Sequence, residues 1–424
     1  MDFLSILIGK TIILFSRTFN LGSGSTWPGH IALKLNQNFC RNILSKSKAI
    51  KIVVAGTNGK TTTGKLIASV LKASQKTYAH NVAGANLLNG LASELIQNST
   101  LFGRIDKDYL IFESDEFALP QILENVNPDY LICLNLFRDQ LDRYGELDSI
   151  AKRWKNSIDK HDSITLILNA DDPLITYLGE NRKNKFYFGL DGKENLKRLK
   201  HGADSIFCPK CSTRLTFEKV YFSHLGIWRC GNCQFERPKP TIIRASFYPL
   251  DGIYNKYNTI AANLLLNKLR FNNDQIVEGL KKFKPAFGRQ EKISYKGKAI
   301  NLFLAKNPTS FNESLATIMD LRAENILIVL NDRIPDGLDV SWIWDIGIER
   351  ILDSDINIMV SGDRTYDMAL RLKYAGIFFH SEENLENAIN SMVDNLDSDE
   401  KLYVLPNYSA MLDVRKILLG RKLL

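Results

Sequence analysis

The sequence predicts an α/β protein: a first domain with a doubly wound, mainly parallel sheet, and a smaller, Rossmann-like α/β domain after it. Three observations predict this fold. Short β-branched runs are followed by polar residues and then by helical patterns, as in parallel strands joined by crossover helices. A glycine-rich loop joins the first such strand to its helix, and two tight cysteine pairs interrupt the pattern later. The 424 residues suit two or three domains.

The composition argues against several classes of protein. Hydrophobic residues make up 45% of the chain and charged residues 24%, which is usual for globular proteins and unlike disordered chains, collagens or multi-pass membrane proteins. The net charge of +8 permits an anionic partner without selecting one. The six cysteines are too few and too clustered for a secreted disulfide framework, so we expect metal binding in a reducing cytosol.

Residues 1–48 are expected to form a helix and a loop packed on the first domain. The most apolar stretch, Phe3–Phe15, is shorter than the roughly 20 residues of a spanning helix, and Lys10 interrupts it. It lacks the basic start and the cleavage site of a signal peptide. We expect a packed amphipathic helix, with contact to the inner face of the membrane as the alternative. Gly22–Gly29 is expected to be a loop.

The first strand is expected at Ile50–Ala55, and the residues after it have the features of a phosphate-binding loop. Gly56–Thr63 (GTNGKTTT) leads into a helical pattern, so backbone N–H groups and a helix N-terminus would face the phosphate oxygens of a ligand. Lys60 is expected to reach the β- and γ-phosphates, and Thr61 to bind Mg²⁺. The strict Walker pattern is not met, because Val54 stands where its first glycine would be. The nucleotide-binding residues expected in this loop are Gly56, Thr57, Asn58, Gly59, Lys60, Thr61 and Thr62.

Three further strands are expected at Tyr109–Phe112, Tyr130–Leu134 and Ile164–Leu168, and each runs into polar residues. The first of them runs into Glu113–Glu116 (ESDE). Acidic residues at the carboxyl ends of parallel strands are where α/β sheets place catalytic groups. Glu113 is therefore a candidate catalytic residue that binds Mg²⁺ directly or through water, with a solvated acidic turn as the alternative.

Two C-x2-C pairs separated by 18 residues predict a zinc ribbon inserted at 205–237 within a first domain of 49–296. Four thiolates make a closed tetrahedral site, so the zinc would be structural. A small β-hairpin is expected between the pairs, and two disulfides or free thiols are the alternative. Nucleic-acid binding is not expected, because basic residues in and after the module are sparse. The expected zinc ligands are Cys208, Cys211, Cys230 and Cys233.

The second domain is expected to span 297–424 and to alternate strands with helical stretches. Its segment Asp336–Asp345 (DGLDVSWIWD) combines acidic residues with two tryptophans, which is unusual for a simple turn. The strands are expected at Ala299–Leu304, Ile326–Leu330, Ile356–Val360 and Tyr403–Leu405.

Several motifs together resemble the Mur ligase superfamily. They are GTNGKTTT at 56–63, ESDE at 113–116, LNLFRDQLDRYGELD at 134–148, LNADDP at 168–173 and YNKYNTIAA at 254–262. Within it, the chain is most similar to the MurT family, the ligase-like subunits of lipid II isoglutaminyl synthase. The features that indicate this family are RDQLDRYGELD, the four-cysteine insertion, FGRQEKI at 287–293 and DGLDVSWIWD. The resemblance covers nearly the whole chain.

The resemblance implies a Mur ligase-like ATP-binding central domain and an ATP-dependent amidation. ATP would phosphorylate the α-carboxylate of D-glutamate in the stem peptide of lipid II, and ammonia would convert the acyl phosphate to D-isoglutamine. Asn258 resembles the family asparagine that contacts the nucleotide, and Arg289 the linker arginine that faces the phosphates. Gln140 stands where Mur ligases often carry a histidine that helps to bind a second Mg²⁺.

The chain shows no glutaminase nucleophile elbow around a cysteine, so glutamine hydrolysis is expected on another polypeptide. The resemblance implies a GatD-like glutamine amidotransferase partner, whose Cys–His pair is completed by an aspartate of this chain; the candidates are Asp339, then Asp336. Two other functions remain open. One is a stand-alone Mur or folylpolyglutamate-type amino-acid ligase, and the other is a zinc-ribbon nucleotide-binding module acting in nucleic-acid metabolism.

Overall fold

The computed structural model describes residues 2–18, 26–81, 86–138, 147–190, 204–285, 288–352, 354–397 and 399–420. The chain forms two compact units. The N-terminal unit comprises Met1–Pro249 and Tyr254–Lys284, and the C-terminal unit comprises Leu250–Ile253 and Pro285–Leu423. Gln140 and most of the RDQLDRYGELD motif lie outside the described residues.

The N-terminal unit is built on a six-stranded, entirely parallel sheet in the order β2-β3-β1-β4-β5-β6. The predicted doubly wound parallel sheet is therefore confirmed, and the four predicted strands match β1, β3, β4 and β5. Their β-branched and aliphatic runs are buried because helices cover both faces of the sheet. The strands are β1 (Ile50–Ala55), β2 (Tyr78–His80), β3 (Tyr109–Ser114), β4 (Tyr130–Cys133), β5 (Thr165–Asn169) and β6 (Lys185–Phe188).

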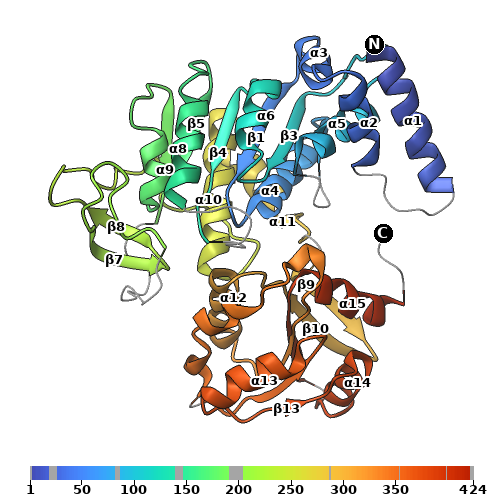
Figure 1. Cartoon of the computed structure of the whole chain (residues 1–424), viewed down its shortest axis with the longest axis vertical. Helices are drawn as coiled ribbons and strands as arrows, with labels where there is room; N and C mark the ends of the chain where they lie inside the picture. Colours follow the sequence, from blue (N-terminus) through green and yellow to red (C-terminus); the bar gives the residue numbers. More distant parts are fainter. Residues whose placement is uncertain are drawn as a thin grey trace. The chain divides into compact units, whose positions relative to one another are not determined.

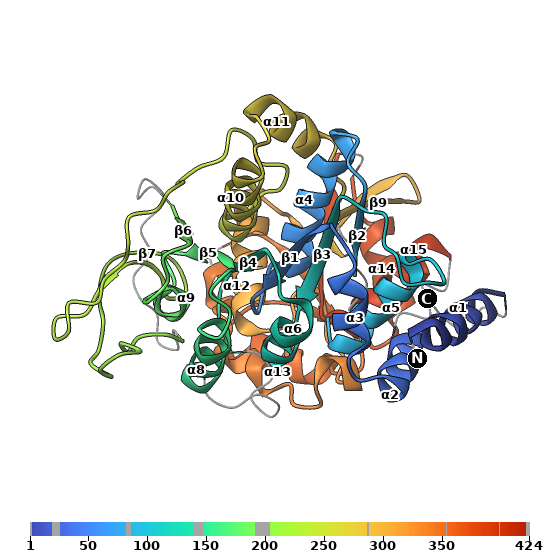
Figure 2. The ribbon, with the colours of Figure 1, turned by 90° about the horizontal axis from the view of Figure 1, so that it is seen from above.

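Helices pack on the two faces of this sheet in separate groups (Figure 2). One face carries α4 (Lys60–Ala73), α10 (Ile253–Lys268) and α11 (Asn273–Lys281). The other face carries α5 (Leu88–Asn98), α6 (Leu119–Val126), α8 (Leu147–Ile158) and α9 (Pro173–Leu178), whose apolar residues join one core with the strands. The carboxyl ends of all six strands therefore meet at one edge, where polar loops are free to form a site.

Three helices precede the first strand and extend the α5 side of the unit: α1 (Asp2–Thr18), α2 (Trp27–Leu35) and α3 (Phe39–Ser45). The prediction of a loop through Gly29 is wrong for residues 27–29, which open α2. Pro28 is compatible with this, since the first turn of a helix needs no donor from it. Among the described residues, no helix is long and apolar enough to cross a membrane.

A two-stranded antiparallel hairpin of β7 (Thr216–Phe222) and β8 (Leu225–Arg229) separates β6 from α10. This confirms the hairpin expected between the two cysteine pairs.

The C-terminal unit has a second six-stranded sheet in the order β13-β12-β11-β14-β10-β9, in which only β9 runs antiparallel to its neighbour. The four predicted strands are confirmed within two residues at each end. The antiparallel edge strand was not predicted, because its sequence RQEKISY carries few apolar residues. The strands are β9 (Arg289–Tyr295), β10 (Lys298–Phe303), β11 (Asn325–Val329), β12 (Asn357–Ser361), β13 (His380–Ser381) and β14 (Lys401–Pro406).

Helices also cover both faces of the second sheet (Figure 1). One face packs against α12 (Pro308–Asp320), α13 (Thr365–Tyr374) and the short 3-10 helices η2 (Ser341–Asp345) and η3 (Ile348–Ile351). The other face packs against α14 (Leu385–Asp394) and α15 (Tyr408–Leu419). The short 3-10 helix η1 (Ile334–Asp336) contacts α15. The DGLDVSWIWD segment thus starts beside α15 and then packs on the α12 side of the sheet through Val340 and Ile343, between β11 and β12 in the chain.

Candidate active site and metal centre

The loop between β1 and α4 is held in shape by the residues that follow β4. The backbone N–H of Thr57 donates to the carbonyl of Asn135 (3.0 Å), and that of Asn58 donates to Asn135 Oδ1 (2.9 Å). Asn135 Nδ2 donates back to the carbonyl of Asn58 (3.1 Å). The loop is therefore pre-organised, which lowers the entropic cost of binding a phosphate there. Asn135 was not among the predicted site residues, although its place directly after a parallel strand was a usable signal.

Asn258 of α10 lies directly against this loop. A Cβ added at Gly59 would stand 2.1 Å from Asn258 Oδ1, and Gly59 has a φ of +92°, which favours glycine. Asn258 Nδ2 also donates to Asn255 Oδ1 (3.3 Å), which orients the side-chain amide. The structure thus brings the predicted nucleotide contact Asn258 together with the predicted phosphate loop.

The side chains of Thr61 and Glu113 meet at the carboxyl edge of the sheet. Thr61 Oγ1, in the first turn of α4, donates to Glu113 Oε2 (2.6 Å) at the end of β3. β3 is the direct neighbour of β1 in the sheet, so the ESDE turn ends beside the phosphate loop. A hydroxyl and a carboxylate oxygen are hard ligands of the kind that Mg²⁺ takes, so the two predicted magnesium ligands fit that ion.

Lys60 lies beside this pair with its ammonium group inside the loop. Nζ donates to the carbonyls of Gly56 (2.5 Å) and Thr57 (3.2 Å) and lies 3.6 Å from Glu116 Oε2. Lys60 and Glu116 are both buried, so little water screens the charge of the ammonium group. Thr62, the last residue predicted for the loop, is buried in the first turn of α4.

His80 is a further member of the site that the sequence did not indicate. Its Nε2 lies 3.0 Å from Glu113 Oε1, and both side chains are buried. A Cβ at Gly64 of α4 would stand 2.5 Å from His80 Nε2, so that glycine makes room for the ring. His80 ends β2, and only the strand order, with β2 beside β3, brings the imidazole to Glu113.

Replacing Glu113 with glutamine is expected to lower ATP-dependent turnover on the order of 100-fold and to raise the Mg²⁺ concentration needed for half-maximal rate. The amide keeps the shape of the side chain and removes the negative charge that would hold the ion. The measurement is turnover as a function of Mg²⁺. Glu386→Gln, at an exposed glutamate of α14 in the C-terminal unit, is the matched control. A Glu113→Gln variant with the Mg²⁺ dependence of the unaltered protein would rule out this role.

The four cysteines of the insertion form one compact cluster. Their sulfur atoms all lie within 4.8 Å of one another, with Cys208 and Cys233 at 3.5 Å and Cys211 and Cys230 also at 3.5 Å. A tetrahedral zinc site with Zn–S bonds of about 2.3 Å separates its sulfurs by about 3.8 Å, close to this spacing. A disulfide bond is about 2.05 Å long, and all six cysteines, which the structure describes, are free. The cluster therefore fits a closed metal site.

The hairpin that carries this cluster is bonded to the LNADDP motif after β5. Trp228 Nε1 donates to the carbonyl of Ala170 (3.2 Å), and Arg237 Nε donates to Asp171 Oδ1 (2.6 Å). Asp171 is fully buried, which raises the pKa of its carboxyl, while Arg237 and Tyr257 act in the opposite direction. The hydroxyl of Tyr257 in α10 donates to Asp171 Oδ2 (2.7 Å). The metal cluster, LNADDP and the helix bearing Asn258 thus form one hydrogen-bonded assembly.

The two candidate aspartates of the C-terminal unit have different surroundings. Asp336 is half-buried, and both of its oxygens accept from the backbone N–H of Ser409 (3.1 and 3.2 Å) in the first turn of α15. Burial raises the pKa of Asp336. Asp339 is exposed and accepts from the backbone N–H of Ser341 (2.8 Å), which lowers its pKa. Asp336 thus caps a helix, whereas Asp339 presents an ionised carboxylate to the surface.

Arg289 opens β9 in the C-terminal unit, and its expected contact with the phosphates stays a prediction.

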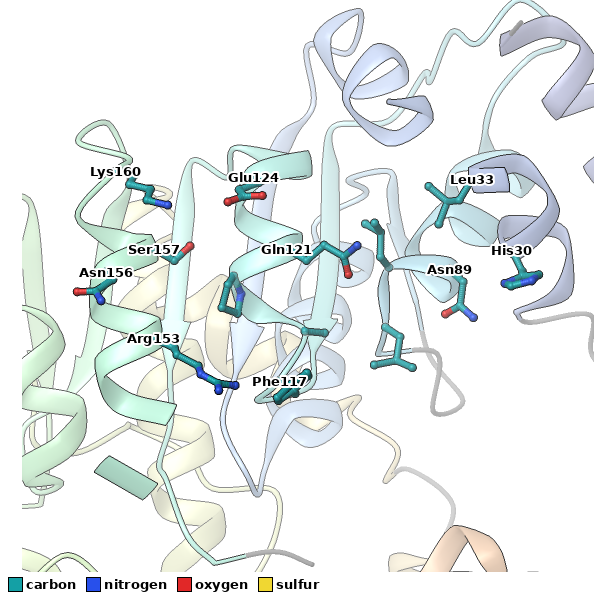
Figure 3. Close-up of a pocket in the computed structure, with 14 residues that line it drawn as sticks. His30, Leu33, Asn89, Phe117, Gln121, Glu124, Arg153, Asn156, Ser157 and Lys160 are labelled. Atoms are coloured by element: carbon teal, nitrogen blue, oxygen red, sulfur yellow. The ribbon is translucent and has the colours of Figure 1, made fainter. Parts of the chain in front are cut away.

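A groove with a volume of about 650 Å³ lies over α6, between α8 on one side and α2 with the start of α5 on the other (Figure 3). It begins at Phe117, the residue after the ESDE turn, where Arg153 of α8 lies 5.4 Å above the phenyl ring. Lys160 adds a second cation and Glu124 an anion, while Leu33, Leu87 and Leu88 line the α2 and α5 side, so the groove combines apolar walls with a few charged groups.

Two family models match the chain. Residues 54–266 match the Mur ligase middle domain, and residues 304–411 match the MurT ligase C-terminal model. Among solved structures, a pseudomurein peptide ligase type C from Methanothermus fervidus aligns with a TM-score of 0.68 and 23% identity, over 89% of this chain and 80% of that one. The MurF ligase from Thermotoga maritima, in complex with ADP, aligns with a TM-score of 0.64 and 17% identity, over 91% and 82%. These likenesses show the Mur ligase fold.

Some curated relatives are more similar in sequence than these solved structures. The MurT subunit of lipid II isoglutaminyl synthase (glutamine-hydrolyzing) from Streptococcus pneumoniae is 32% identical over 95% of this chain and 94% of its own length. The Staphylococcus aureus subunit is 32% identical over 84% of each chain. The fold, the phosphate loop and the middle-domain match define a Mur ligase, a class that uses ATP. Within that class, the chain belongs to the MurT family of lipid II isoglutaminyl synthase subunits, as the sequence predicted.

Proposed function

We propose that this chain catalyses the ATP-dependent amidation of the α-carboxylate of D-glutamate in the stem peptide of lipid II, giving D-isoglutamine for peptidoglycan synthesis. The contact between Thr61 and Glu113, with Lys60 inside the same loop, is the observation that carries the proposal. The reaction would take place in the cytoplasm at the inner face of the membrane, where ATP and a lipid-linked substrate meet.

The chemistry requires an activated acyl group, because a carboxylate is a poor acyl donor. A carboxylate oxygen attacks the γ-phosphorus of ATP, and ADP leaves with the electrons of the broken P–O bond. The nitrogen lone pair of ammonia then attacks the acyl carbon, inorganic phosphate leaves, and the nitrogen loses a proton. Lys60 would stabilise the charge that develops on the phosphoryl oxygens. Thr61 and Glu113 would hold a Mg²⁺, which supplies charge neutralisation at the phosphates when bound.

The cysteine cluster would hold one Zn²⁺ in a structural role. Four thiolates leave no open coordination position for a substrate, so the ion would stabilise the fold of the module rather than take part in the chemistry. The bonds from its hairpin to Asp171 and Ala170 support this role, because they tie the cluster to a motif of the ATP-binding unit.

Ammonia would come from a separate GatD-like glutaminase subunit, and Asp339 would complete the Cys–His pair of that partner. An aspartate in this role must be ionised and accessible, so that it orients the histidine and stabilises its charged form. Asp339 meets both requirements, whereas Asp336 is bonded to the start of α15. The exposed side chains of Ile334 and Leu338 flank Asp339 and offer apolar area to a protein partner.

Replacing Asp339 with asparagine is expected to lower glutamine hydrolysis by the complex on the order of 100-fold, while ATP binding stays unchanged. The amide cannot stabilise a charged histidine on the partner. Glutaminase turnover and ATP affinity are measured on the same preparation. Asp345→Asn, at an exposed acid of η2, serves as the control. Unchanged hydrolysis in Asp339→Asn would remove Asp339 from the proposed triad.

The proposed function is tested by co-expressing the chain with a neighbouring glutaminase and assaying the purified complex on lipid II with glutamine, ATP and Mg²⁺. Mass spectrometry is expected to show replacement of one hydroxyl by an amino group in the stem peptide, with ADP and phosphate released. A complex that forms no amidated product would contradict the proposal. Ligation of an amino acid by the chain alone would favour the stand-alone ligase instead.

A further inference from the structure

The N-terminal helix α1 is apolar on two sides. One side is buried on the N-terminal unit, where Ile6 and Ile13 join the core and Gly9 packs on Ile96 of α5. The opposite side is exposed, with Leu14 and Phe15 accessible to 68% and 57%. The residues of the exposed stripe are Phe3, Leu4, Leu7, Leu14 and Phe15, which recur at the spacing of one helical face.

Neighbouring side chains widen this stripe into a patch. Phe102, 81% exposed, lies 5.9 Å from the ring of Phe3, and Trp27 at the start of α2 is 69% exposed. The hydroxyl of Thr11, which lies within the stripe, donates to the carbonyl of Leu7 (2.9 Å), so it is already bonded within the helix. Contiguous exposed apolar surface of this kind marks an interaction site.

The N-terminal segment that carries most of this patch is strongly cationic. The first 48 residues contain six lysines and arginines and a single acidic residue, Asp2, so they hold most of the net charge of +8. Asp2 itself is paired with Lys46 (3.6 Å). Exposed aromatic and aliphatic side chains on a cationic segment are the combination that binds an anionic bilayer surface.

We propose that the exposed face of α1, together with Phe102 and Trp27, docks on the surface of an anionic lipid bilayer. The helix would lie in the interface with its apolar stripe among the acyl chains. A second copy of the chain is a poorer occupant, because a two-fold contact would bring the cationic N-terminal segments against each other.

The patch adjoins the groove over α6 through α2. The indole ring of Trp27, in the helix that packs on α1, lies 6.3 Å from the ring of His30, which lines the groove that begins at the ESDE turn. If the chain acts on lipid II, which rests on the proposed function, docking would hold the groove close to the headgroup of a lipid-linked substrate.

The test is co-sedimentation of the full chain with vesicles, first of phosphatidylglycerol and phosphatidylcholine in equal parts, then of phosphatidylcholine alone. The unaltered chain is expected to bind the anionic vesicles, and more weakly at high salt. The double variant Phe15→Ser with Phe102→Ser is expected to lower the partition coefficient about tenfold or more. Phe378→Ser, at a phenylalanine of the C-terminal unit that is 80% exposed, is the control. This variant should bind the vesicles as strongly as the unaltered chain.

Equal binding by the double variant and the unaltered chain would overturn the proposal, and so would an unaltered chain that stays in solution. A double variant that only converts a dimer to a monomer would assign the patch to a second copy instead. Vesicle binding needs neither ATP nor lipid II, so a chain that does not bind vesicles would not contradict the proposed ligase function. A failed amidation assay would likewise not contradict membrane docking.

Discussion

Replacing Lys60 with alanine is expected to lower ATP-dependent turnover by about a thousandfold, equivalent to roughly 4 kcal/mol of lost transition-state stabilisation. The ammonium group is buried in the phosphate loop, held by the carbonyls of Gly56 and Thr57. A charge in that position acts on the phosphates with little screening by water. Its removal also takes away the ammonium group that lies 3.6 Å from the buried carboxylate of Glu116.

The measurement for Lys60→Ala is release of ADP from the complex in the presence of lipid II, glutamine and Mg²⁺. Lys72→Ala, at an exposed lysine in the last turn of the same helix, should keep full activity. Thermal unfolding of both variants separates a loss of chemistry from a loss of fold. A folded Lys60→Ala enzyme within threefold of the unaltered rate would mean that Lys60 does not contact the phosphates.

Replacing Cys211 and Cys230 together with serine is expected to abolish zinc binding and to destabilise the N-terminal unit. Structural zinc contributes on the order of 10 kcal/mol to the folding of a small module. If about 3 kcal/mol of this free energy stabilises the N-terminal unit as a whole, its loss lowers the melting temperature by roughly 6–12 °C. We also expect a higher KM for ATP, because the hairpin orients Asp171 and, through Tyr257, the helix that bears Asn258.

Zinc content by elemental analysis, thermal unfolding and the KM for ATP are measured on the same samples of this double variant. Cys40→Ala changes a thiol outside the cluster and should keep the zinc. Full zinc occupancy in the serine variant, or zinc loss with an unchanged melting temperature, would contradict a structural metal site.

Several features could be read from the sequence because they depend on residues that are close together in the chain. The glycines and lysine of 56–63 follow a β-branched run directly, and the two cysteine pairs have a spacing that few other structures require. Gly22–Gly29 shows the weakness of such local rules, since Trp27–Gly29 is helical in the structure. There, packing of α2 on α5, with the N–H of Gly29 donating to Ser93 (2.8 Å), outweighs the local preference for a loop.

By itself, the sequence determined the parallel sheet of the first domain, the α/β character of the second, the phosphate loop, the four-cysteine cluster and the family of this protein. Only the tertiary structure decided that His80, Asn135 and Glu116 belong with the phosphate loop, that Asp339 is exposed while Asp336 caps α15, and that α1 leaves an apolar face uncovered. The physical reason is that a motif records its neighbours along the chain, whereas strand order and helix packing bring together side chains that lie far apart in it. Which of two similar aspartates is buried depends on the element that packs against it, and nothing in the surrounding residues encodes that.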